Sequence, residues 1–150
     1  MKHDIAAGSR DDWVGLQGQV VVRIEESDTA RALGSGDVLV LGTPRLIAVL
    51  EEASVAAILA VVADEDTSVG TRIDVLHRRP TPVGAELEAI ARVVSVEGSR
   101  VEFEVSADHL LPSGEREAKV GRGTITRAIV PRADFPSLRS GVDPVPKFRS

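Results

Sequence analysis

The sequence contains no cysteine and no tyrosine, and aromatic residues make up 3% of its 150 positions. Without cysteine, disulfide bonds, thiolate metal sites and cysteine nucleophiles are excluded. The scarcity of aromatic rings disfavours a surface that stacks nucleic-acid bases. A net charge of −5 likewise disfavours nonspecific binding to nucleic acid or to an anionic membrane. The chain is 43% hydrophobic, which is ordinary for a single globular domain with its own core.

Histidine is also scarce, and no metal or other cofactor is expected. The sequence holds three histidines, none at a spacing typical of a metal site: His3, His77 and His109. The first residues are polar and acidic, unlike the apolar core of a signal peptide. The longest apolar stretch, 46–62, is interrupted by two glutamates and is shorter than the roughly 20 residues of a membrane span. We therefore expect a cytoplasmic protein without a membrane segment.

The pattern of apolar residues predicts one strand, one helix and then four further strands. The first strand is expected over 19–27. Thr43 is expected to cap the helix, Pro44 to be its first residue, and the helix to run to about Val62. The later strands follow from period-two alternation: 71–77, 85–96, 100–108 and 116–130. Residues 1–16 are expected to form a flexible arm, 17–130 the domain, and 131–150 a proline-rich tail.

The predicted helix is apolar nearly all round, which places it inside the protein. A sheet with one apolar face must bury that face against another element, and this helix is the element available. The expected fold is therefore α+β, with an antiparallel sheet wrapped around one central apolar helix, which is the hot-dog arrangement. Ile90 leaves the inward row of its strand, so a bulge is expected there. Gly121 and Gly123 mark a place where another group approaches the last strand closely.

Two polar residues stand out against this apolar background. Glu51 lies four residues after Ile47 and four before Val55, so its stripe of the helix is apolar on both sides. It is either a functional carboxylate or a side chain that reaches solvent, and the adjacent Glu52 can replace it in the functional role. His77 ends the apolar row of its strand. It is either a core histidine or a proton handler paired with the glutamate.

Three blocks carry a resemblance to a known family: "LGTPRLIAVLEEAS", "VGTRIDVLHRRPTPVGAELEAIARVVSVEGSRVEFEVSA" and "GRGTITRAIV". In this order they resemble the fluoroacetyl-CoA thioesterase-like branch of the hot-dog thioesterases. The resemblance implies a site that includes Thr43, Glu51, Gly70 and His77. The last strand of the family commonly reads Gly-x-Gly-x-His-x-Arg, and here Ile125 replaces that histidine while Arg127 is kept.

The resemblance implies hydrolysis of a small or medium acyl-CoA thioester to free acid and CoA. It also implies a homodimer whose sheets join edge to edge, with acyl-CoA bound near the interface. Gly70 can offer its N–H to the thioester oxygen or simply serve a turn. Arg78 and Arg79 can bind the phosphates of CoA or remain a solvated pair, and Arg127 is assigned to the substrate side.

Several alternatives stay open at this point. Glu51 can attack the thioester carbonyl, or Glu51 or His77 can act as general base on water. We expect Glu51 and His77 to face each other across the helix and sheet. Thr43 can act in catalysis or only cap the helix, and if it shares one helix with Glu51 the two lie roughly 12 Å apart. The rival functions are a non-catalytic acyl-CoA-binding module and another hot-dog enzyme such as an enoyl-CoA hydratase.

Overall fold

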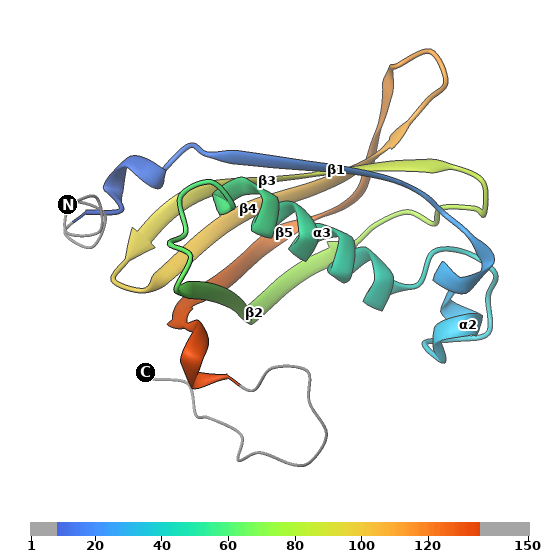
Figure 1. Cartoon of the computed structure of the whole chain (residues 1–150). Coiled ribbons are helices and arrows are strands. Elements are labelled where there is room, and N and C mark those ends of the chain that lie inside the picture. Colours follow the sequence, from blue (N-terminus) through green and yellow to red (C-terminus); the bar gives the residue numbers. More distant parts are fainter. Residues whose placement is uncertain (1–8, 136–150) are drawn as a thin grey trace.

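The computed structural model describes residues 9–135, which form one antiparallel sheet with a long helix against it (Figure 1). The five strands are β1 (Gln17–Arg23), β2 (Asp66–His77), β3 (Glu86–Glu97), β4 (Arg100–Leu110) and β5 (Arg116–Pro131). The α-helices are α2 (Ala30–Leu33) and α3 (Thr43–Ile58), and the 3₁₀ turns are η1 (Asp11–Trp13), η2 (Glu26–Asp28) and η3 (Arg132–Asp134). The strand order is β1-β3-β4-β5-β2, so β1 and β2 form the two edges.

Helix α3 and one face of the sheet form the core. Alternation puts one row of each central strand against the helix, and these inward residues are at most 3% exposed: Leu87, Ala89, Ala91 and Val93 of β3, and Val101, Phe103, Val105 and Ala107 of β4. The helix contributes Leu46, Val49, Leu50 and Ala53, all fully buried. The predicted α+β fold, an antiparallel sheet wrapped around one helix, is confirmed.

The two ends of α3 differ from the prediction. Gly42 is the N-cap and Thr43 is the first helical residue, with no side chain capping the helix. The Thr43 hydroxyl is engaged elsewhere, by His77. The helix ends at Ile58 rather than near Val62, because the N–H groups of both Val61 and Val62 donate to the Ile58 carbonyl and turn the chain.

The expectation that α3 is buried on all sides is wrong for the single chain. Its buried side consists of Leu46, Val49, Leu50, Ala53, Ser54, Ala57 and Ile58. On its other side, Val55 is 38% exposed and Leu59 is 72% exposed. One five-stranded sheet covers only one side of a helix, so a strip of apolar surface remains open beside β2.

The bulge and the first strand also differ from the sequence prediction. The β3–β4 pairing runs without interruption through Ile90 and shifts instead between Val93 and Ser95. Ile90 lies on the outward face, opposite Gln19 of β1, so its position reflects normal alternation. Strand β1 ends at Arg23, before the turn η2.

Part of the predicted N-terminal arm packs on the domain. Trp13, in η1, is 4% exposed and belongs to the core cluster. Leu16 packs against that cluster, and its carbonyl accepts a hydrogen bond from Val93. Residues 1–8 of this arm and 136–150 of the predicted tail lie outside the described residues. Within the described range, no helix is long and apolar enough to cross a membrane.

Glycines let the elements approach one another closely at two places. A Cβ at Gly18 of β1 would overlap the backbone of Ala53 and Ala57, so this glycine fixes how near α3 lies to the sheet. A Cβ at Gly123 would overlap the Asp74 carbonyl of β2, which confirms the expected close approach to β5.

We predict that Gly18→Ala destabilises the fold by about 1–3 kcal/mol, because the added methyl must push α3 off the sheet. Urea unfolding monitored by circular dichroism measures this loss. Gln17→Ala, at an exposed position of the same strand, is the control and should change stability little. Equal stability of the two variants would contradict the close contact.

Candidate functional site

The first part of the site joins the start of α3 to the end of β2. Thr43 Oγ1 lies 2.8 Å from His77 Nδ1. His77 pairs with Gly121 of β5, and its side chain shares the inward face with Val75. A contact between residues 34 positions apart therefore replaces the helix cap predicted for Thr43.

The His77 ring is suited to carry a proton. Burial lowers its pKa from the ordinary 6.5, although the nearby backbone of Arg79 opposes that effect. Its Nε2 atom is buried and has no hydrogen-bond partner among residues 9–135. A neutral imidazole has one N–H and one lone pair, so the ring can relay a proton between Thr43 and a group that reaches Nε2.

The second part of the site surrounds Glu51, two turns further along α3. Glu51 Oε2 lies 3.3 Å from an Arg127 nitrogen, and the Arg127 side chain is only 8% exposed. Arg127 also donates from Nε to Ser68 Oγ at 2.9 Å and from its other terminal nitrogen to the Ser68 carbonyl at 3.1 Å. Burial lowers the pKa of Arg127, while the Glu51 charge and hydrogen bond oppose the shift. Arg127 therefore holds and orients the carboxylate of Glu51 within the chain.

Gly70 lies directly under this carboxylate. It pairs with Arg127 in the sheet, immediately before a register shift in β2. A Cβ at this position would overlap the Glu51 carboxylate, so only glycine leaves room for it. Gly70 is thus a strand residue next to the carboxylate and not a turn glycine.

The structure does not bring Glu51 and His77 together in one chain. No hydrogen bond or ion pair of the described residues joins Glu51 to His77 or Thr43. Thr43 and Glu51 share the regular helix α3, and eight residues of rise separate them by roughly 12 Å. The expectation that Glu51 and His77 face each other is therefore wrong for the single chain.

The neighbouring Glu52 occupies a different environment. Its side chain is 52% exposed and lies 3.3 Å from Arg45 in an ion pair. Such an exposed pair is an ordinary surface feature. Of the two adjacent glutamates, Glu51 is the one placed against the sheet, as the resemblance implied.

The backbone just beyond His77 brings together segments that carry three exposed cations: Arg78, Arg79 and Lys119. The backbone N–H groups of Arg78 and Arg79 both donate to the Val120 carbonyl, at 2.7 and 3.4 Å. Lys119, the residue before Val120, has a φ angle of 109°. This left-handed backbone conformation is strained for a residue with a side chain. None of the three side chains forms an ion pair within residues 9–135.

The sequence analysis did not single out Ser68 or Lys119. The structure also shows where Ile125 lies, the residue that departs from the pattern of the family. Ser68 precedes Gly70 by two and so shares its inward face, a signal that alternation offers. Nothing in the sequence marks the strained backbone of Lys119. Ile125, which stands where the family commonly has histidine, is fully buried in the core wall. Among the described residues, no group of three or more acidic or histidine side chains is arranged to hold a metal ion.

Comparison with known proteins assigns the chain to a family. Residues 24–133 match the model of the fluoroacetyl-CoA-specific thioesterase family. The chain belongs to this family. The fluoroacetyl-CoA thioesterase of Streptantibioticus cattleyicolor is 32% identical over 91 residues, which cover 61% of each protein. The chain thus aligns with about three fifths of that relative's length.

Solved structures agree with this assignment. A fluoroacetyl-CoA thioesterase variant in complex with acetyl-CoA superposes with a TM-score of 0.72 at 26% identity, over 81% of this chain and 92% of that one. A thioesterase superfamily member from Thermus thermophilus has a TM-score of 0.70 at 23% identity, over 80% and 85% of the two chains. The second likeness concerns the fold alone.

We predict that the His77 ring titrates below pH 6.5, because burial penalises its charged form. NMR titration measures the midpoint, with the signal assigned by its loss in His77→Gln. Because the folded pKa is depressed, the unfolded chain takes up this proton first, and the contribution of His77 to stability falls as the pH drops below about 6.5. A titration midpoint above pH 6.5 would show that burial does not control the pKa of the His77 ring.

Proposed function

We propose that this protein is an acyl-CoA thioesterase that hydrolyses small or medium acyl-CoA thioesters to free acid and CoA. The observation that carries the proposal is the Glu51 carboxylate, held by Arg127 over Gly70 on an otherwise apolar helix. Family membership supports the reaction class. Neither alternative, a non-catalytic binding module or an enoyl-CoA hydratase, gains support from that match.

Glu51 supplies the lone pair for the reaction in either of two ways. It attacks the thioester carbon, forming a mixed anhydride as the C–S bond breaks, and water then hydrolyses the anhydride. Alternatively it removes a proton from water, which attacks the same carbon. In both cases the departing CoA sulfur receives a proton. We assign the Gly70 N–H to the thioester oxygen, since Gly70 adjoins the carboxylate.

We further propose a homodimer joined along β2. This strand is an edge of 12 residues, and its central part from Gly70 to Asp74 is exposed. An uncovered edge of this length invites pairing with another chain. Beside it lies the open strip of α3, with Val55 and Leu59, together with the exposed side chain of Ile73 on the inward face of β2. A second copy that pairs with β2 covers the exposed edge and lies beside this apolar strip.

Such a dimer also explains why the site is divided in one chain. A two-fold axis through an antiparallel β2–β2 pair reverses the strand. The His77 end of one copy then lies beside the Asp66–Ser68 end of the other, which is the end nearest Glu51 and Arg127. We propose that Thr43 and His77 of one copy complete the site of Glu51 in the other, with His77 relaying the proton to the CoA sulfur.

The exposed cations fit the other end of the substrate. Arg78 and Arg79 follow His77 directly, and Lys119 adjoins the Val120 carbonyl that their N–H groups share. We propose that these three side chains bind the phosphate groups of CoA, since charge-assisted hydrogen bonds to phosphate are strong.

Replacing either reacting side chain tests the proposal. Glu51→Gln keeps the shape of the side chain without its charge, and His77→Ala removes the proton relay. Each should lower kcat/KM by roughly 10²-fold or more, the range for positioned acid–base groups. The assay follows CoA release with a thiol reagent over a panel of acyl-CoAs.

Glu52→Gln is the matched control, because Glu52 only pairs with Arg45 at the surface. It should retain nearly full turnover. Loss of activity in Glu52→Gln but not in Glu51→Gln would mean that the adjacent carboxylate is the reacting one. Full activity in all three variants would place the chemistry elsewhere.

A further inference from the structure

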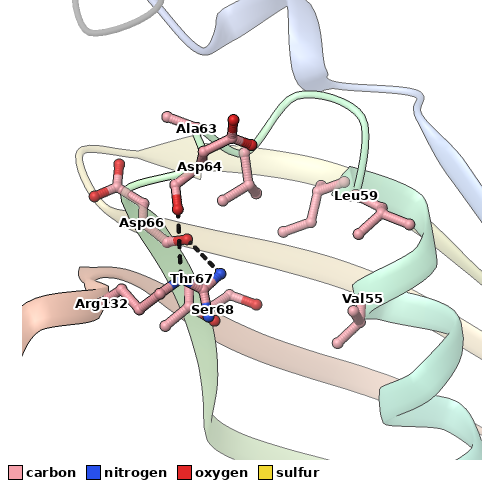
Figure 2. A pocket seen from close by; sticks show the side chains of 10 residues that line it. Val55, Leu59, Ala63, Asp64, Asp66, Thr67, Ser68 and Arg132 are labelled. Atoms are coloured by element: carbon pink, nitrogen blue, oxygen red, sulfur yellow. Dashed lines mark hydrogen bonds between the residues drawn. The ribbon is translucent and has the colours of Figure 1, made fainter. Parts of the chain in front are cut away.

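A hollow opens between the end of α3 and the start of β2 (Figure 2). Val55 and Leu59 lie along the helix on one side, and Thr67, Ser68 and Arg132 lie across from them. Its volume is about 170 Å³. Half of its lining is apolar: Val55, Ile58, Leu59, Val62 and Ala63.

The hollow adjoins the Glu51 site through Ser68. Val55 is one helical turn beyond Glu51 and therefore lies on the same face of α3. Ser68, which lines the hollow, accepts hydrogen bonds from Arg127, and Arg127 in turn holds Glu51. A thioester whose carbonyl lies at Glu51 can therefore direct its acyl chain along Val55, which is 38% exposed and lines the hollow.

Charge decides which acyl chains are suited to this space. Two carboxylates, those of Asp64 and Asp66, stand at the end away from Glu51. The Arg132 guanidinium donates to the backbone carbonyls of the same two residues, at 3.4 and 3.0 Å. One cation against two anions leaves this end negative, which disfavours an acyl group ending in a carboxylate.

We propose that this hollow is the acyl-binding pocket and that Leu59 and Arg132 set the length of the chain it accepts. The inference rests on the proposed thioesterase function and names its substrate class: uncharged apolar acyl groups of medium length. The space is far larger than one water molecule and leaves room for several methylene groups of an acyl chain. Leu59 stands eight residues beyond Glu51, roughly 12 Å along the helix, where a longer chain meets the Arg132 end.

The test measures kcat/KM for acyl-CoAs from acetyl to dodecanoyl, with succinyl-CoA for charge. In the wild type, kcat/KM should rise roughly 3-fold for each added methylene up to medium length, in line with burial of apolar surface. It should then fall for longer chains. Leu59→Trp should lower the ratio of hexanoyl-CoA to acetyl-CoA at least tenfold, and Leu59→Ala should move the optimum to longer chains.

Val21→Trp is the control, since Val21 is exposed on β1 at the far edge of the sheet, and it should keep the wild-type ratio. The affinities of hexanoyl-CoA and acetyl-CoA are also measured by calorimetry with the Glu51→Gln variant, which tests the pocket independently of turnover. Hydrolysis with a chain-length profile that neither Leu59 variant changes would overturn the pocket but leave the thioesterase function standing. The opposite outcome has two parts: hexanoyl-CoA binds more tightly than acetyl-CoA and loses this advantage when Leu59→Trp is added, but the wild type hydrolyses no thioester. That outcome would support the pocket and overturn the thioesterase function.

Discussion

The regularity of α3 is the constraint on which the site depends. Thr43 and Glu51 belong to one helix, and eight residues of rise keep them roughly 12 Å apart. Each residue has its own partner in the sheet: Thr43 contacts His77, and Glu51 contacts Arg127. The chain therefore carries two separate parts of the proposed site, spaced along the surface that α3 and β2 share.

The packing of α3 explains how a carboxylate persists in so apolar a helix. Gly18 and Gly70 have no side chains between the helix and the edge strands, so the helix lies close to the sheet and Glu51 reaches the backbone of β2. Arg127 supplies the opposite charge from the inward face of β5, and Ser68 accepts hydrogen bonds from its two other side-chain nitrogens. Only the Arg127 side of the pair is buried, and the Glu51 side chain remains 35% exposed, which lowers the cost of desolvating its charge.

Much of this arrangement was predictable from the sequence, because alternation and helical periodicity fix which faces are buried. The strands, the long helix α3 and Glu51 as a polar residue in an apolar stripe all follow from those periods, whereas the short helix α2 was not predicted. The partner of Glu51 did not follow, because it depends on the register that places Gly70 of β2 opposite Arg127 of β5. Thr43 was expected to cap the helix because the N-cap preference of threonine depends only on neighbouring residues. Its actual partner, His77, lies 34 residues away in sequence. The strained backbone of Lys119 leaves no trace in residue type.

The central claim is that two copies share each site, and subunit mixing tests it most directly. Glu51→Gln and His77→Ala dimers, each nearly inactive alone, are unfolded together and refolded, and heterodimers are confirmed by capture through two different tags. In a mixed dimer one site has both Glu51 and His77 intact, so the account predicts recovery to roughly a quarter of wild-type activity after random pairing. Heterodimers that form but remain as inactive as their parents would contradict the shared site.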